Sequence, residues 1–298
     1  MWEGDRPVAP TEFATDFYWL AALPSLATSA IEKTIIDGVE KTNSQAESIL
    51  FLGTGGARMM VESQKLASGG IWLKLNGVEV LLDPGPGSIV RVTDRKLDAS
   101  KLSAVIVSHR HLDHSGDVNI MVESMVQGGH YRHGWFFAPA DALDFEPVMY
   151  SYLKKYLDGV GVLKEGGSYS VSGLSFETPL RHQHSVETYG ITFKSSRHTV
   201  SYIADSLYFD GLATAYKSDL LIINVVFVNP VPHIDHLSIP DVKEIVARLK
   251  PKAAIITHFS THLYESNPML IAAQLSEETG VRVIAARDGM EFNLKELD

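Results

Sequence analysis

Cysteine is absent from this sequence of 298 residues, and its absence limits the chemistry that the chain can support. Without thiols the chain can form no disulfide bond and can offer no thiolate to a metal ion. Any metal site must therefore be built from histidine, aspartate and glutamate. Imidazole nitrogen and carboxylate oxygen together suit zinc, manganese or iron.

Long apolar runs are also absent. The longest, residues 220–228, contains Asn224 and is well short of the roughly 18 apolar residues that mark a membrane span. The first residues include Glu3 and Asp5 in place of the basic segment that opens a signal peptide. We therefore expect no membrane span, and we take a cytoplasmic location as the default expectation.

An excess of positive charge is missing as well. The chain has 26 lysines and arginines against 36 aspartates and glutamates, which gives a formal net charge of -10. This balance provides no global basic surface for nucleic acid, although a local patch could still serve. The remaining composition is ordinary for a globular protein, and the chain is long enough to bury a full core.

The most informative segment that is present is a cluster of histidines after a short apolar run, residues 104–107. His109, His111, Asp113 and His114 bring three imidazoles and a carboxylate within six residues. In an extended segment alternate residues share a face, so His109, His111 and Asp113 can point the same way. Such groups are costly to desolvate unless something binds them. The pattern therefore predicts a metal site.

Further candidate ligands follow other strand-like runs, at His184, Asp205, His236 and His258. Each of them alone is compatible with an ordinary polar residue at the end of a strand. Layered folds assemble sites from distant parts of the sequence at strand ends. Their common placement therefore favours one shared site.

The chain divides into an N-terminal extension at residues 1–47, expected to be a helical arm or lid, and a main domain at residues 48–298. Asn76-Gly77 lies between two strand-like runs and predicts a β-hairpin. The glycine-rich residues 53–56 lack the lysine of a nucleotide-binding loop, so a tight turn is expected there.

Two later segments give further expectations. Residues 140–157 have apolar and aromatic positions that predict a helix. Residues 281–285 and 290–294 are expected to close the chain as a hairpin. Hairpins and α/β units recur in two halves, which predicts a mixed α/β (α+β) fold of two sheets packed face to face with helices outside.

These motifs resemble those of a known family. The segment from His109 to His114 resembles the HxHxDH signature of the metallo-β-lactamase superfamily. Later segments resemble motifs of its ribonuclease Z-like branch, namely those around His184, Asp205, His236 and His258. The resemblance covers about residues 48–294 and implies a four-layer αββα metallo-β-lactamase-like sandwich.

The resemblance also implies two divalent metal ions, Zn2+ or alternatively Mn2+ or Fe. One ion would be held by His109, His111 and His184, and the other by Asp113, His114 and His258. Asp205 would bridge the two ions. A metal-bridging hydroxide would act as the nucleophile, Asp113 would orient or deprotonate it, and His236 would protonate the leaving alkoxide or stabilise its charge.

The implied function is a dinuclear metal-dependent hydrolase, namely a phosphodiesterase or ribonuclease Z-like nuclease. Its substrate would be a small phosphodiester or RNA, and the branch suggests a homodimer. The alternative is hydrolysis of a carboxyl ester, lactone, thioester or sulfate ester on the same fold. A non-catalytic binding protein is disfavoured, because every implied ligand position is filled.

Some positions depart from the branch or have supporting roles. Asn224 stands where the branch usually has glutamate. Residues 128–178 lack a Gly/Lys-rich arm that would bind transfer RNA. His182, His233 and His262 flank implied ligands. They are expected to lie at the surface or to support the ligands, and the lining of a substrate pocket is the alternative. Asp83 is expected to support the metal site from behind.

Overall fold

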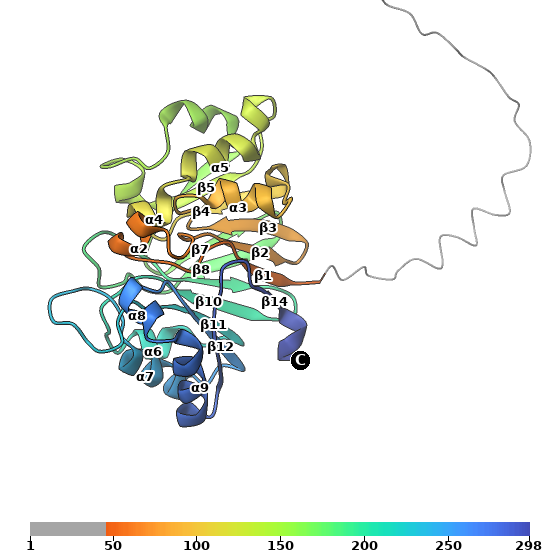
Figure 1. Ribbon diagram of the computed structural model, residues 1–298. Helices are drawn as coiled ribbons and strands as arrows, with labels where there is room; N and C mark the ends of the chain where they lie inside the picture. Colours follow the sequence, from red (N-terminus) through yellow and green to blue (C-terminus); the bar gives the residue numbers. More distant parts are fainter. Residues whose placement is uncertain (1–45) are drawn as a thin grey trace, which may run out of the picture. The chain divides into compact units, whose positions relative to one another are not determined.

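The computed structural model describes residues 46–298, which form two seven-stranded sheets (Figure 1). The first sheet has the spatial order β14 (Glu291–Asn293), β1 (Ser48–Phe51), β2 (Ile71–Leu75), β3 (Val78–Leu82), β4 (Leu102–Ile106), β5 (Trp135–Pro139) and β6 (Gly159–Leu163). The second has the order β13 (Arg282–Ala285), β12 (Ala253–Thr257), β11 (Leu220–Asn224), β10 (Thr199–Ile203), β9 (Ile191–Lys194), β8 (Leu174–Thr178) and β7 (Gly167–Val171).

Helices cover the outer face of each sheet (Figure 1). The first sheet is covered by α3 (Ser88–Asp94) and α5 (Val118–Met125), and the second by α6 (Leu212–Ala215), α7 (Ile239–Leu249) and α9 (Pro268–Thr279). The short helices α2 (Arg58–Ser63), α4 (Leu112–Ser115) and α8 (Thr261–Glu265) follow strand ends. Short 3-10 helices lie at Ala99–Lys101, Gln127–Gly129, Ala140–Ala142, Ser151–Tyr156 and Leu294–Leu297. The predicted αββα sandwich is confirmed.

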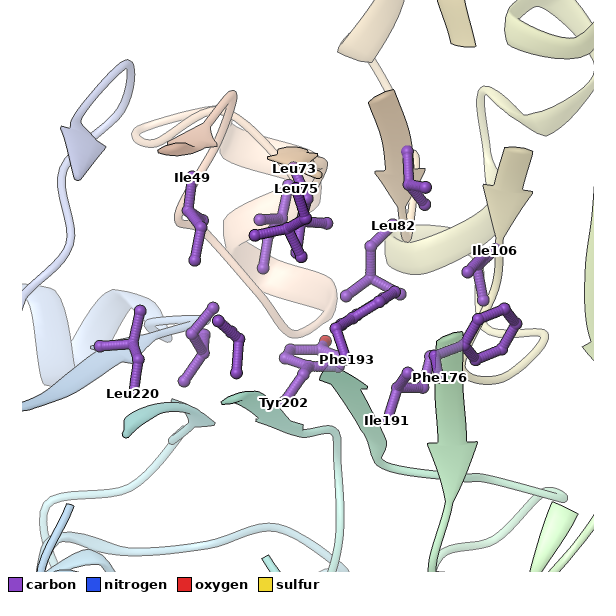
Figure 2. Packing of buried hydrophobic residues seen from close by; sticks show 14 of the residues in the cluster. Ile49, Leu73, Leu75, Leu82, Ile106, Phe176, Ile191, Phe193, Tyr202 and Leu220 are labelled. Carbon is purple, nitrogen blue, oxygen red and sulfur yellow. The ribbon is translucent and has the colours of Figure 1, made fainter. Parts of the chain in front are cut away.

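The central core lies between the sheets and explains why the strands read as continuous apolar runs. In β1, Ile49 and Phe51 face this core, whereas Leu50 packs under the outer helices. Figure 2 shows Ile49 and its neighbours in the first sheet facing Tyr202 and Phe193 in the second. Strands that are buried on both faces carry apolar residues without alternation.

The hairpin prediction is confirmed at Asn76-Gly77. Strands β2 and β3 pair antiparallel through Ile71↔Leu82 and Leu75↔Val78. Asn76 has φ 52° and Gly77 has φ 76°, the left-handed values that a tight two-residue hairpin turn requires.

The helix prediction at residues 140–157 is wrong. The segment contains only the turns Ala140–Ala142 and Ser151–Tyr156, with irregular chain between them. Pro147 lacks an N–H and disfavours helix at the preceding residue, so one continuous helix cannot form. The apolar pattern arises because Leu143 and Leu153 pack into the outer core instead.

The closing hairpin is also wrong, because the two strands belong to different sheets. Strand β13 pairs parallel with β12, and β14 pairs antiparallel with β1. The turn between them carries the chain from one sheet to the other. There Asp288 accepts hydrogen bonds from the N–H groups of Thr54 (2.9 Å) and Ala67 (2.7 Å), which fixes the crossing.

Except for its last two residues, the predicted extension at 1–47 lies outside the described residues. None of the helices within residues 46–298 combines the length and apolar content that crossing a membrane requires.

Candidate metal centre

The candidate residues lie at one end of both sheets because the strands that precede them run parallel. In the second sheet β10, β11 and β12 are parallel, so Asp205, Asn224 and His258 follow or end neighbouring strands at the same edge. In the first sheet β3 and β4 are parallel, which brings Asp83 beside the segment that begins at His109. The two edges together form the site.

Three imidazoles form the first cluster. The Nδ1 of His111 lies 3.1 Å from the Nε2 of His109 and 3.1 Å from the Nε2 of His184. Burial holds the pKa of His109 well below its usual value, and the charge of His114 lowers it further. Burial likewise lowers the pKa of His111 to about 4, so this ring is neutral at pH 7. Neutral imidazoles are the form that binds metal ions.

Two carboxylates and two imidazoles form the second cluster. The Nε2 of His258 lies 2.9 Å from the Nε2 of His114 and 3.2 Å from the Oδ2 of Asp113. Asp205 completes the group. Although burial opposes ionisation, the charge of His114 and a hydrogen bond from His258 hold the pKa of Asp113 below its usual value.

Asp205 lies between the two clusters. Its Oδ2 is 3.4 Å from the Nε2 of His114 and 3.9 Å from the Nε2 of His109. The same oxygen is 3.5 Å from the Nδ1 of His236, whereas Oδ1 is 3.6 Å from the Nδ1 of His258. Burial opposes ionisation of Asp205, but the charges of His258 and His114 outweigh it and hold its pKa well below its usual value.

A buried network stands behind the second cluster and is centred on Asp83. Its carboxylate accepts hydrogen bonds from the N–H and hydroxyl of Ser108 (2.6 and 2.7 Å), the Nδ1 of His114 (2.9 Å) and the hydroxyl of Tyr202 (2.8 Å). Asn224 donates to both Tyr202 and Asp205, each at 2.8 Å. Burial raises the pKa of Tyr202 well above its usual value, and Asp83 adds to the shift, so the phenol remains a donor.

Unusual backbone positions bring two of these side chains into the site. Asp83 has φ 50° and His258 has φ 65°, a conformation that is uncommon for residues other than glycine. The ring of His258 lies against the backbone of Gly56, where a Cβ would come within 2.2 Å of its Nδ1. The glycine-rich turn at residues 53–56 therefore makes room for His258.

The donor set fits divalent metal ions. With bonds of about 2.0–2.1 Å in a tetrahedral arrangement, ligand atoms lie about 3.3 Å apart, close to the spacing in both clusters. The Nδ1 of His184 donates to the carbonyl of Asp235 (2.9 Å) and that of His114 to Asp83, so each Nε2 is free to face its cluster. Within residues 46–298, the buried Nδ1 of His258 has no hydrogen-bond partner.

The structure brings together all seven implied ligands and His236, in groups whose ligand atoms lie within 4.8 Å of one another. His182 is outside these groups, because its Nε2 accepts from the hydroxyl of Tyr216 (2.7 Å) in the core. His233 and His262 line the cavity, which is the alternative interpretation for them, whereas His182 does not. Asp83 supports the site as expected.

Sequence reasoning assigned no role to Tyr202 or Ser108. Tyr202 lies in an apolar strand and Ser108 stands next to the histidine cluster, so neither has a pattern of its own. Ser108 reaches Asp83 from just after the neighbouring strand of the same sheet, and Tyr202 reaches it from the second sheet, so only the three-dimensional structure shows that both donate to Asp83.

A cavity of about 920 Å³ opens over both clusters. Its lining includes His111, Asp113, His184, Asp205 and His236 from the candidate metal centre. A volume of this size accommodates a small organic molecule in contact with the clusters.

Comparison with known proteins agrees with this geometry. The family model of the beta-lactamase superfamily domain matches residues 79–259. An uncharacterized protein of Methanocaldococcus jannaschii is 30% identical over 257 residues, covering 83% of this chain and 94% of that protein. A ribonuclease Z of Sulfolobus acidocaldarius is 25% identical over 153 residues, covering 51% of this chain and 49% of the enzyme.

The crystal structure of the metallo-beta-lactamase fold protein YhfI from Bacillus subtilis resembles this chain with a TM-score of 0.70. The identity is 20%, over 83% of this chain and 99% of that one, so this likeness concerns the fold. The family model, by contrast, spans the histidine cluster and ends just after His258. The chain therefore belongs to the beta-lactamase superfamily and has the metallo-β-lactamase fold.

Proposed function

We propose that the chain is a dinuclear metal-dependent hydrolase of phosphodiester bonds. The observation that carries this proposal is the position of Asp205, whose carboxylate faces one cluster through His109 and the other through His114 and His258. One carboxylate with two oxygens can serve two cations at once. The two adjoining clusters differ in composition, because one contains three imidazoles and the other contains carboxylates as well. Two separate sets of ligands favour binding of two ions rather than one.

In this proposal His109, His111 and His184 hold one ion, and Asp113, His114 and His258 hold the other. Asp205 is shared. Bound divalent ions would supply an activated water and would stabilise negative charge on the reacting phosphoryl oxygens. Positioning of the water and transfer of protons would depend on the side chains around the ions.

Asp113 is proposed to orient the attacking water or to accept its proton. Its Oδ2 accepts a hydrogen bond from the N–H of Ala57 at 3.0 Å, which fixes the plane of the carboxylate. The side chain lies both in the second cluster and in the cavity lining, so it can reach water and metal together.

His236 is proposed to act on the leaving group. Its ring lines the cavity, and its Nδ1 lies 3.5 Å from Asp205. This position leaves the opposite side of the ring available to a departing alkoxide, which needs a proton or a hydrogen bond to leave. Burial lowers the pKa of His236, and a bound phosphodiester anion would work against that effect by favouring the protonated ring.

The choice of phosphodiester bonds is supported by similarity to a protein named ribonuclease Z. Hydrolysis of a carboxyl ester, lactone, thioester or sulfate ester is the competing outcome. Purified protein loaded with Zn2+ or Mn2+ should accelerate hydrolysis of bis(4-nitrophenyl) phosphate over its uncatalysed rate by a larger factor than hydrolysis of 4-nitrophenyl acetate. The opposite preference would overturn the phosphodiester assignment.

His236→Ala tests the site with a phosphodiester that has an alkyl leaving group, because a departing alkoxide needs a proton whereas 4-nitrophenolate does not. This variant should lose most of the phosphodiester turnover, whereas His130→Ala, an exposed histidine outside the cavity, should keep it. Full turnover in His236→Ala would remove this residue from the mechanism.

A further inference from the structure

Large apolar side chains stand exposed around the mouth of the cavity. Met59 on α2 is 72% exposed, Leu112 on α4 is 76% exposed, and Ile234 in the loop before α7 is 42% exposed. All three line the cavity over the candidate metal centre, and we call them the apolar rim. A single exposed apolar residue is ordinary, but several around one cavity mark a surface that a ligand covers.

The apolar surface continues inward from the rim. Val226 and Phe227 also line the cavity, and the ring of Phe227 lies 6.1 Å from that of His236 between centroids. The apolar wall therefore reaches the residue proposed to act on the leaving group. A substrate whose phosphoryl group lies at the metal centre would place one substituent along this wall.

The charges around the cavity disfavour a nucleic-acid strand. Among the described residues that line it, Arg58 is the sole lysine or arginine, and Glu62 and Asp235 add negative charge beyond the metal centre. Proteins that hold a nucleic-acid strand follow its phosphates with several cations and stack its bases on aromatic side chains. The rim offers aliphatic side chains and little positive charge.

We propose that the substrate is a small phosphodiester with an apolar substituent, and that the apolar rim binds this substituent. The inference rests on the proposed function, and it names the substrate class of the same site. Hydrolysis would add the hydroxyl of water to phosphorus and a proton to the departing oxygen. The products are a phosphate monoester and an alcohol.

A homologous series of alkyl 4-nitrophenyl phosphates tests the proposal. With methyl, butyl and octyl members, KM should fall by at least about tenfold from the shortest chain to the longest, because each methylene on the rim leaves water. Met59→Gln and Ile234→Gln should each remove much of this dependence. Met269→Gln and Leu270→Gln are matched controls, because these side chains are 51% and 55% exposed on α9, outside the cavity lining.

Direct binding provides a second readout that needs no turnover. Calorimetry on the metal-loaded protein should give a Kd at least about tenfold lower for octylphosphonate than for methylphosphonate. This difference should shrink in Met59→Gln and persist in Met269→Gln. Equal binding of the two phosphonates, or a KM independent of chain length, would overturn the role of the rim.

The outcomes separate this inference from the function on which it rests. If no phosphodiester is cleaved but octylphosphonate binds preferentially, the proposed reaction fails and the apolar recognition survives. If phosphodiesters are cleaved with a KM independent of chain length, the reaction survives and the recognition fails. Tighter binding of a short single-stranded RNA than of octylphosphonate would assign the cavity to nucleic acid instead.

Discussion

The side-chain amide of Asn224 donates a hydrogen bond to the Oδ1 of Asp205 at 2.8 Å. The same Nδ2 donates to the hydroxyl of Tyr202, which in turn donates to Asp83. The sequence has asparagine where the resembled branch usually has glutamate. A carboxylate cannot donate to Asp205 unless it is protonated, so the amide supplies a contact that the glutamate would not.

Asn224→Ala should weaken metal binding about 10- to 100-fold, the range found when a hydrogen-bonding partner of a ligand is lost. The change frees the carboxylate of Asp205 to rotate away from the position between the clusters. Titration of the metal-free protein with Zn2+ against a competing chelator measures the effect. Asn229→Ala changes an exposed asparagine outside the cavity lining and should leave the affinity unchanged. Equal affinity in both variants would deny Asn224 a positioning role.

Metal content should follow the division into two clusters. Wild-type protein should retain two divalent ions per chain after gel filtration, as measured by elemental analysis. His184→Ala removes a member of the first cluster and His258→Ala one of the second, so each should lower the content toward one ion. Asp205→Ala should lower it further, because both clusters contact this carboxylate. A single ion in the wild type, or two in His184→Ala, would contradict the dinuclear proposal.

Much of the site could be predicted from the sequence because its members follow apolar strands. His109, Asp205 and His258 each come directly after such a run, and parallel strands bring Asp205 and His258 to one edge of the second sheet. Local pattern was sufficient there. The hairpin at Asn76-Gly77 could also be predicted from local sequence, since its turn type depends on two adjacent residues.

The remaining features depend on contacts between distant segments. Tyr202 donates to Asp83 across the interface of the two sheets, and no local pattern marks either residue for this bond. The sequences of β13 and β14 resemble a hairpin because the two strands are short and close together in the chain. In the structure β13 pairs with β12 in the second sheet, and β14 pairs with β1 in the first. The left-handed backbone of His258 is likewise imposed by its surroundings.

His236 should matter more as the leaving group becomes poorer. A 4-nitrophenolate leaves readily without a proton, whereas an alkoxide needs one. His236→Ala should therefore lower kcat for an alkyl leaving group at least about tenfold more than for 4-nitrophenol, while metal content stays at the wild-type value. Measuring kcat across phenols of graded acidity gives the dependence. An equal decrease in kcat for every leaving group would show that His236 does not act on the leaving group and has another role, such as positioning Asp205.

Gly56→Ala should disturb the site through His258. The new Cβ would lie within 2.2–2.3 Å of ring atoms of His258, and the backbone of that residue is already in a left-handed conformation. We expect a loss of about 1–3 kcal/mol in the free energy of unfolding of the chelator-treated protein, as for other overpacked sites. In a His258→Ala background the same change should cost much less. An equal loss of unfolding free energy in the two backgrounds would show that the new Cβ does not clash with His258.

Asp219 gives a pH-dependent prediction at the opposite end of the second sheet. Its carboxylate accepts from the N–H of Thr199 (2.9 Å) and lies 3.2 Å from the Nζ of Lys252. Burial opposes ionisation, but these contacts with Thr199 and Lys252 outweigh it and hold the pKa of Asp219 below its usual value. Because the folded state lowers this pKa, the stabilisation is complete above the unfolded value of about 4 and is lost as the pH falls through the folded value.

Asp219→Asn should therefore lower the free energy of unfolding by about 0.5–1 kcal/mol at pH 7, the scale of a partly exposed ion pair with a hydrogen bond. The difference in the free energy of unfolding between Asp219→Asn and wild type should become smaller as the pH falls from 4 toward 3. Urea unfolding curves at each pH measure it, and metal content at pH 7 should not change because the site lies at the other strand ends. Asp94→Asn removes an exposed carboxylate 3.6 Å from Arg91 and should have little effect at any pH. A difference for Asp219→Asn that stays constant down to pH 3 would show that its carboxylate charge contributes nothing.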